Sequence, residues 1–234
     1  FLGFRAIRLC LKREDLYRPQ LKALLRASAY GDIRIMVPMV TCLDELRAVK
    51  NMIAELKEEL KAEGVAYDEN IKVGIMIETP AASLMADVFA KEADFFSIGT
   101  NDLTGYTMAV DRGNENVSYL YSALNPAVIR SIKRIIECAH NAGIEVGMCG
   151  EAAADERMIP LLLAFGLDEF SVTVSRVLEV RKEIASWSVK EAKDIAQSIS
   201  GYSEEKEVAN YLNDYVMSAK ERENVAEQSQ NIEK

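Results

Sequence analysis

The chain has 234 residues, of which 49% are hydrophobic and 28% are charged, and its formal net charge is −9. This composition is that of an ordinary globular protein with a sizeable core. The acidic balance disfavours a role in binding nucleic acid, and no apolar stretch is long enough to span a membrane. No secretory signal peptide is visible and the four cysteines lack metal-binding spacing, which favours a cytoplasmic protein with free thiols.

Five short apolar runs, each bounded by turn or cap signals, are predicted to be buried β-strands. They are Ile33–Val37, Lys72–Ile77, Phe95–Ile98, Glu145–Met148 and Glu169–Val172. A possible additional strand lies around Phe4–Leu9, near the start of the chain.

Helical patterns separate these strands along the chain. They show a 3.6-residue apolar repeat, or an N-cap residue followed by proline, or a capping box. The predicted helices run from Leu43 to Glu63, from Thr79-Pro80 to Ala90, from Asn125-Pro126 to Gly143, over Val189–Ser198 and onward from Ser203. The last residues are charged and polar, so that end of the chain is expected to fray.

The alternation of strand and helix predicts an α/β fold with a parallel sheet. A closed (β/α)8 TIM-type barrel needs eight strands in ~250 residues, and fewer are found here. We therefore expect the chain to begin partway into such a barrel, with residues 1–218 forming the barrel domain and residues 219–234 a tail. An open doubly wound sheet is the alternative, although no GxGxxG motif follows any strand.

Polar residues suited to chemistry follow several predicted strands. Glu78 comes after the second strand, Asp102 after the third and Cys149 at the end of the fourth. The carboxyl ends of the strands carry the active site in a parallel barrel, so these side chains are expected to meet there.

Glu78 and Asp102 would place two hard oxygen ligands at neighbouring strand ends, which suits Mg²⁺. Each carboxylate alone could equally interact with a helix start or a turn. Arg112 precedes Gly113, and its guanidinium could grip a phosphate or a carboxylate in bidentate fashion. The alternative for Arg112 is a surface ion pair with Asp111.

Arg5 and Arg8 both fall in the possible first strand. Their odd separation would place them on different sides of that strand, so at most one of them would face the barrel mouth.

Cys149 stands between Met148 and Gly150, in a stretch whose glycines leave its thiol open to a ligand. A thiol with a pKa near ~8.5 can donate a proton at neutral pH, although a small buried apolar role is common for free cysteine. Glu151 could be a further metal or hydrogen-bonding group, or a carboxylate near a helix start. His140, the only histidine, is expected to be structural.

Three stretches carry a family resemblance: FLGFRAIR at the start, DFFSIGTNDLTGYTMAVDR over Asp94–Arg112, and GMCGE over Gly147–Glu151. They resemble the phosphoenolpyruvate-utilising enzymes, and most closely the C-terminal domain found in the enzyme I group of bacterial sugar phosphotransferase systems. The resemblance runs from Phe1 to about Tyr215. It implies a (β/α)8 barrel that binds phosphoenolpyruvate and Mg²⁺ and forms a homodimer.

The resemblance also implies roles for individual residues. It implies metal ligands at Glu78 and Asp102, substrate contacts at Arg5, Asn101, Asp102 and Arg112, and an acid at Cys149 that protonates carbon 3 of the enolate to give pyruvate. Phosphoryl transfer depends mainly on positioning and charge neutralisation, which arginines and Mg²⁺ supply.

Two departures from the family pattern stand out. Gly105 occupies a position where the family signature usually has glutamine. The family's phosphohistidine domain, its domain that binds the histidine-containing phosphocarrier protein, and two further substrate-binding arginines are expected upstream of Phe1. We therefore expect these 234 residues alone to bind phosphoenolpyruvate weakly and not to complete phosphotransfer.

Two other functions remain open from the sequence. One is a Mg²⁺-dependent carbon–carbon lyase or aldolase acting on pyruvoyl substrates, whose barrels also place a glutamate and an aspartate on strand ends. The other is a non-catalytic truncated barrel that serves in dimerisation or in regulation by metabolites.

Overall fold

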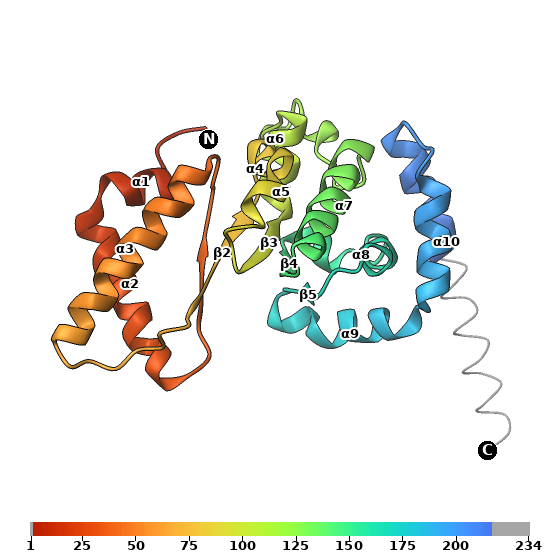
Figure 1. Cartoon of the computed structure of the whole chain (residues 1–234). Coiled ribbons are helices and arrows are strands. Elements are labelled where there is room, and N and C mark those ends of the chain that lie inside the picture. Colours follow the sequence, from red (N-terminus) through yellow and green to blue (C-terminus); the bar gives the residue numbers. More distant parts are fainter. Residues whose placement is uncertain (1, 217–234) are drawn as a thin grey trace, which may run out of the picture.

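A computed structural model of the chain describes residues 2–216. These residues contain one parallel sheet in which every strand lies beside the next strand along the chain (Figure 1). The strands are β1 (Arg34–Val37), β2 (Lys72–Ile77), β3 (Phe95–Gly99), β4 (Glu145–Cys149) and β5 (Glu169–Phe170). The α/β class and all five predicted strands are confirmed. Within residues 2–216 the sheet is open, with β1 and β5 at its edges.

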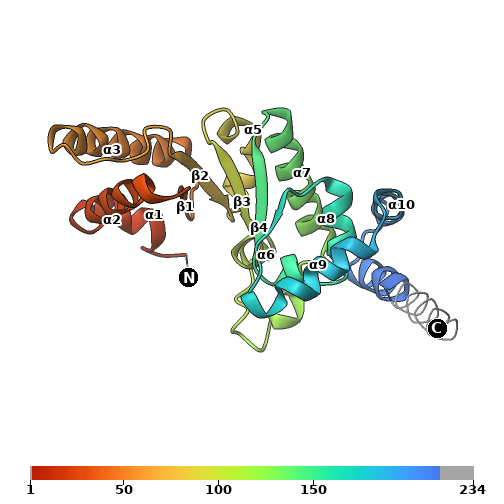
Figure 2. The same cartoon turned by 90° about the horizontal axis from the view of Figure 1, so that it is seen from below.

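Helices connect successive strands, as in a TIM-type barrel. In chain order they are α1 (Ala6–Lys12), α2 (Glu14–Ala27), α3 (Leu43–Ala62), α4 (Pro80–Leu84), α5 (Ala86–Phe89), α6 (Thr100–Met108), α7 (Pro126–Asn141), α8 (Ile159–Phe165), α9 (Val177–Ser186) and α10 (Val189–Ile199). Residues 205–216 are also helical. Helices α1, α2 and α3 gather beside β1, whereas α8 and α10 lie toward the other edge (Figures 1 and 2).

The possible strand around Phe4–Leu9 is wrong, because α1 occupies this segment. Arg5 keeps an extended backbone as the N-cap, and the helix begins at Ala6. Ile7 is fully buried, and Cys10 and Leu11 pack against the same core. This spacing of three and four residues is that of a helix face, and the run is too short for periodicity alone to separate strand from helix.

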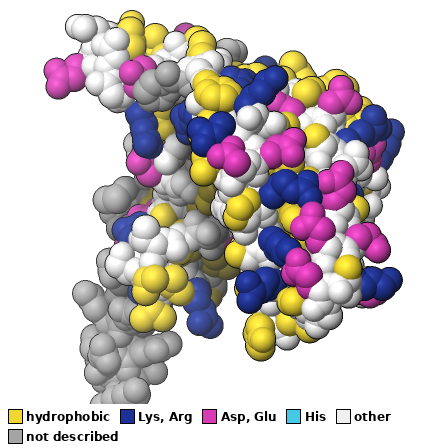
Figure 3. All heavy atoms as spheres, turned by 90° about the vertical axis from the view of Figure 1, so that its left-hand side faces the viewer, with side chains coloured by type: hydrophobic (Ala, Val, Ile, Leu, Met, Phe, Trp, Pro, Cys, Tyr) yellow, Lys and Arg dark blue, Asp and Glu magenta, His cyan; other side chains and the backbone are white. Residues whose placement is uncertain are grey.

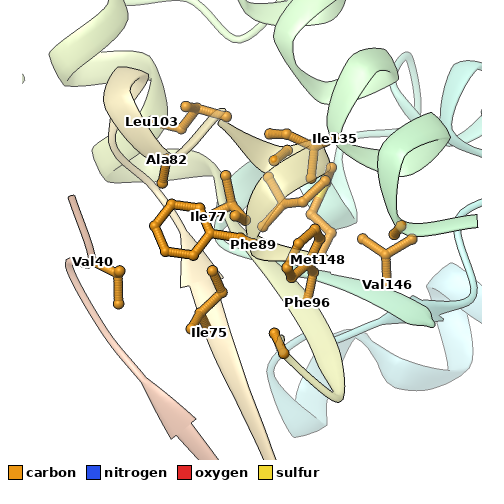
Figure 4. Packing of buried hydrophobic residues seen from close by; sticks show 14 of the residues in the cluster. Val40, Ile75, Ile77, Ala82, Phe89, Phe96, Leu103, Ile135, Val146 and Met148 are labelled. Atoms are coloured by element: carbon orange, nitrogen blue, oxygen red, sulfur yellow. The ribbon is translucent and has the colours of Figure 1, made fainter. Parts of the chain in front are cut away.

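One face of the sheet packs against helices to form the core. Figure 4 shows Phe96 and Met148 of the sheet packed against Phe89 of α5 and Ile135 of α7. Each of these four side chains is at most 1% exposed. Apolar side chains from strands and helices thus interlock on this side, which fixes the positions of the strand ends.

The opposite face of the sheet carries small and polar side chains. On this face Ser97 of β3 pairs with Gly147 of β4, and Gly99 pairs with Cys149. Because side chains alternate along a strand, Ser97, Gly99, Gly147 and Cys149 all belong to this face. In a closed barrel this is the inner face, and its glycines leave room for the polar groups near the strand ends.

Acidic and basic side chains alternate on the face of the molecule formed around α2 and α3 (Figure 3). Arg18 of α2 binds Glu55 and Glu59 of α3, each at 2.7 Å, and Lys22 binds Glu63 at 2.7 Å. Arg18 and Lys22 are thus paired with carboxylates, which disfavours a surface for nucleic acid.

Three further predictions bear on the chain as a whole. No helix in residues 2–216 combines the length and the apolar character needed to cross a bilayer. The four cysteines are free thiols, as predicted. The predicted tail at 219–234 lies outside the described residues, and the domain boundary at residue 218 stays a prediction.

Candidate active site

Glu78 directly follows β2, and its side chain is only 5% exposed. The main-chain N–H of Met39 donates a hydrogen bond to its Oε1 atom at 2.6 Å. Met39 has a left-handed backbone, with φ of 57°, which is uncommon for a long side chain. The turn after β1 thus adopts a costly conformation while aiming an N–H group at the Glu78 carboxyl.

The environment of Glu78 favours its protonated form. Burial, reinforced by the nearby charge of Asp102, raises the pKa of Glu78 to about 7, and the Met39 N–H partly offsets this. The polar interaction of the Asp102 carboxyl with Glu78 also raises the pKa of Glu78, and the charge of Arg5 lowers it. A protonated carboxyl beside a second carboxylate is suited to exchange its proton for a divalent cation.

Gly99 makes room for this arrangement. A Cβ atom at position 99 would lie 2.9 Å from Oε2 of Glu78 and 2.8 Å from Sδ of Met76. Any larger residue at the end of β3 would therefore push the Glu78 carboxyl out of place.

Asp102 lies in the first turn of α6, where a carboxylate interacts favourably with the helix dipole. Its Oδ2 atom is 3.3 Å from Nη2 of Arg5, which comes from the N-cap of α1. Arg5, Asp102 and Glu78 therefore form one group although they are far apart in the sequence.

Asn101, Arg112 and Glu151 form a second group at the same edge of the sheet. Oδ1 of Asn101 accepts a hydrogen bond from the main-chain N–H of Glu151 at 3.2 Å. The Glu151 carboxylate in turn lies 3.9 Å from Nη1 of Arg112. Glu151 thus pairs with Arg112, and the alternative for Arg112, an ion pair with Asp111, is not formed among the described residues.

Cys149 ends β4 and lies beside Gly99 of β3. Burial raises the pKa of its thiol, the polar side chain of Ser97 lowers it, and the charge of Glu78 raises it again. The net shift is upward from an ordinary value of 9.0, so the thiol keeps its proton at neutral pH. Its carbonyl oxygen accepts a hydrogen bond from the Thr100 hydroxyl at 2.9 Å.

A cavity of about 500 Å³ opens beside these two groups. Asn101, Asp102 and Arg112 line it, together with Arg8 of α1 and Gly105 of α6. Glu78 and Cys149 do not line this cavity and lie nearer the sheet. The cavity is therefore an adjoining chamber, with Asp102 at the boundary between it and the buried carboxyl of Glu78.

The residues present fit a divalent cation. Within residues 2–216, no group of three or more His, Cys, Asp and Glu side chains is placed to hold a metal. Glu78 and Asp102 supply two hard oxygen ligands, and a Mg²⁺ ion usually completes its coordination with water and substrate oxygens.

Several contacts at the site were not foreseen from the sequence. The N–H of Met39, the hydroxyl of Ser97 and the hydroxyl of Thr100 each hold a predicted site residue. Ser97 could have been found, because it alternates with Gly99 on the strand that precedes Asp102. The other two arise from chain segments whose approach no local pattern reveals.

His140 lies away from this group, as expected. Its Nε2 atom is 3.0 Å from Oδ2 of Asp168, and the same carboxylate accepts the main-chain N–H of Val146 at 2.9 Å. Val146 is near the start of β4, at the opposite end of the strand from Cys149, so the contact ties α7 to the sheet.

Comparisons with known proteins identify the family of the chain. Residues 1–189 match the model of a family described as PEP-utilising enzyme, PEP-binding domain. A phosphoenolpyruvate-protein phosphotransferase from Staphylococcus aureus is 51% identical over 216 residues, which cover 92% of this chain and 38% of that relative. One from Geobacillus stearothermophilus is 52% identical over 212 residues, covering 91% and 37%. The chain thus spans less than two fifths of the length of these relatives.

A solved structure confirms the type of fold. A citrate lyase from Burkholderia xenovorans LB400 superposes with a TM-score of 0.53 at 16% identity, covering 90% of this chain and 69% of that one. At this identity the similarity concerns the fold alone, a TIM-type α/β architecture. The residues that match the family model, by contrast, include Glu78, Asp102 and Cys149 at the strand ends. Members of that family use a divalent metal. The chain therefore belongs to the phosphoenolpyruvate-utilising enzymes, and it contains their phosphoenolpyruvate-binding domain.

Proposed function

We propose that this chain is the phosphoenolpyruvate- and Mg²⁺-binding part of a phosphoenolpyruvate-protein phosphotransferase. The observation that carries the proposal is the convergence of Glu78, Asp102 and Cys149 at one edge of the sheet. The identity of 51% with relatives of that name supports it.

Glu78 and Asp102 would hold the Mg²⁺ ion, which when bound supplies positive charge to the phosphoryl group and the enolate. The proton on Glu78 leaves when the cation binds, because the carboxyl must ionise to act as a ligand.

Arg5, Asn101 and Arg112 would orient the substrate anion. Arg5 and Arg112 each already face a carboxylate, Asp102 and Glu151 respectively. An incoming phosphate or carboxylate group competes for the same guanidinium donors, so substrate binding redistributes these ion pairs without moving the backbone. Such positioning is the protein's main contribution to phosphoryl transfer.

Cys149 would complete the reaction as a general acid. The bond between phosphorus and the enol oxygen breaks, and its electron pair stays on that oxygen as an enolate. Carbon 3 of the enolate takes the proton of the Cys149 thiol, which gives pyruvate and a thiolate that regains a proton from solvent. The Ser97 side chain, which lowers the pKa of the Cys149 thiol, would stabilise this thiolate.

The phosphoryl group would pass to a histidine on a separate phosphohistidine domain and from there to a histidine-containing phosphocarrier protein, in support of sugar uptake. We further propose that the protein works in the cytoplasm as a homodimer. The name of the relatives, which states transfer from phosphoenolpyruvate to a protein, supports this route.

The test is Cys149→Ala in the intact protein, with Cys138→Ala as a matched control. Cys138 is a buried thiol of α7 that does not line the cavity. We expect Cys149→Ala to slow pyruvate release by about 10²- to 10⁴-fold while phosphoenolpyruvate binding, measured by calorimetry with Mg²⁺, changes little. Cys138→Ala should retain turnover.

Unchanged pyruvate release in Cys149→Ala would refute the acid assignment. The lyase or aldolase alternative would instead be supported by Mg²⁺-dependent condensation of pyruvate with an aldehyde, without any response to phosphoenolpyruvate.

A further inference from the structure

Arg8 lies in the cavity beside the candidate active site. It is on α1, three residues after Arg5, and its side chain is partly buried. Arg5 is the N-cap of α1 and contacts Asp102, and Arg8 lies within the first turns of the helix and lines the cavity that Asp102 also lines. The cavity wall includes Arg8 together with Asn101, Asp102 and Arg112.

The guanidinium of Arg8 has contacts unlike those of the other two arginines. Its Nη1 atom donates to the main-chain oxygens of Leu2 at 3.3 Å and Gly3 at 3.4 Å. Among residues 2–216, no carboxylate lies within 4.0 Å of this guanidinium. Arg5 and Arg112, in contrast, each face a carboxylate.

A partly buried cation without a carboxylate partner is costly unless an anion approaches it. A guanidinium has five N–H donors, and the two carbonyl contacts use only one of its nitrogen atoms. The other nitrogen atoms make no hydrogen bond among residues 2–216, and Arg8 lines the cavity. Arg8 is therefore the cation of the cavity wall that can receive an anionic ligand without first giving up an ion pair.

We propose that Arg8 is a further substrate-binding residue, which contacts an anionic group of the phosphoenolpyruvate that occupies the adjoining site. The proposal rests on the proposed function, because that function puts an anion bearing both a carboxylate and a phosphate at Asp102. Arg8 acts in binding and orientation, with no bond made or broken at its side chain.

The test is made in the intact protein with Arg8→Ala, Arg8→Lys and the control Arg26→Ala. Arg26 is an exposed arginine near the end of α2 that does not line the cavity. Calorimetry gives the Kd for phosphoenolpyruvate in the presence of Mg²⁺, and the Kd for Mg²⁺ alone. Pyruvate and inorganic phosphate are titrated separately.

Loss of a charge-assisted contact should raise the Kd for phosphoenolpyruvate about 10- to 100-fold in Arg8→Ala. Arg8→Lys should recover part of this loss, because lysine keeps the charge without the planar fork. Arg26→Ala should match the unmodified protein, and the Kd for Mg²⁺ should be unchanged in all variants. The smaller ligand whose Kd also rises, pyruvate or phosphate, identifies the group that Arg8 contacts.

Three outcomes would overturn the proposal. The first is a Kd for phosphoenolpyruvate in Arg8→Ala within threefold of that of the unmodified protein, and the second is an unchanged Kd for both pyruvate and phosphate. The third is a weaker affinity for phosphoenolpyruvate that Arg8→Lys does not restore and that accompanies a weaker affinity for Mg²⁺. The last pattern would mean that Arg8 only holds the segment at Leu2 and Gly3. If the unmodified protein itself fails to bind phosphoenolpyruvate with Mg²⁺, the proposed function fails, which is a distinct result.

Discussion

Glu78 links the stability of the protein to pH. Its pKa is raised to about 7 from an ordinary value of 4.5, so the folded protein holds this proton more tightly than the unfolded chain. The stabilisation is fully present below pH ~4.5 and is lost as the pH rises through about 7, by up to about 3 kcal/mol. Without a divalent cation, the folded state must therefore become less stable across this range.

The variant Glu78→Gln should remove this dependence. Glutamine keeps the size of the side chain and carries no ionisable proton, so the free energy of unfolding should change less between pH 5 and pH 8. Urea unfolding in the presence of a chelator measures it, with Glu58→Gln as the control, since Glu58 is an exposed residue of α3. Equal pH slopes for the unmodified protein and Glu78→Gln would contradict the assignment.

The location of individual site residues was partly predictable. Glu78, Asp102 and Cys149 could be placed at strand ends because each follows a clear apolar run. The contact between Arg5 and Asp102 was not derivable from the residues, since it depends on α1 where a strand was considered possible. The expectation that at most one of Arg5 and Arg8 faces the barrel mouth assumed a strand, and this segment is instead the N-cap and first turns of α1, with Arg5 at Asp102 and Arg8 in the cavity wall.

At the scale of the element, two helices end at a residue with a left-handed backbone, which is alanine in one and glycine in the other. The C-cap of α6 is Ala109, an exposed alanine with φ of 55°, whereas Gly143 follows α7 with φ of 73°. A Cβ at position 143 would meet no atom within 4 Å. The difference between these positions is therefore one of backbone strain and not of packing.

This difference predicts opposite effects of two substitutions. Ala109→Gly should stabilise the protein by about 0.5–1 kcal/mol, and Gly143→Ala should destabilise it by about 1 kcal/mol. Ala142→Gly is the control, because Ala142 has φ of −93° and relieves no strain when changed. Urea denaturation measures all three, and a destabilising Ala109→Gly would show that the α6 end is set by other contacts.

The helices that begin near Leu43, Pro126 and Val189 were predictable to within a residue or two, whereas the single helix predicted from Thr79-Pro80 to Ala90 is divided into α4 and α5. The apolar stripe from Leu43 to Glu63 became α3, and the N-caps Thr79, Asn125 and Ser188 each accept the expected main-chain hydrogen bond. Strand β5 is shorter than predicted: it ends at Phe170 and pairs with β4 at two positions, Gly147 with Glu169 and Met148 with Phe170. The length of β5 thus depends on its pairing with β4, which the local sequence does not reveal.

At the scale of the whole molecule, the strands differ in how many neighbours they have. Strands β2, β3 and β4 are paired on both sides, while β1 and β5 are paired on one side within residues 2–216. Main-chain N–H groups in the central strands should therefore exchange with deuterium most slowly, and those of β1 and β5 faster. Hydrogen exchange followed by mass spectrometry measures this order, and slower exchange in β1 than in β3 would contradict it.

The parallel α/β class was predictable because strand and helix signals alternate, whereas closure of the barrel was not. Periodicity identifies which face of a strand is buried, but the number of strands around an axis depends on shear and tilt. Gly99 and Gly147 leave room for polar groups on the inner face. That Gly99 pairs with Cys149 and Gly147 with Ser97 follows from the register of β3 and β4, which the sequence does not reveal.

The order in which the strands lie has a consequence for biosynthesis. Since each strand docks onto the one synthesised just before it, the sheet can grow from β1 to β5 as the polypeptide leaves the ribosome. Each of these five strands therefore pairs with a strand that is close to it in the sequence. This shortens the time during which an unpaired strand edge could form hydrogen bonds with another nascent chain. The site would accordingly form late, when β4 places the Cys149 thiol near Glu78, which follows β2 and is synthesised earlier.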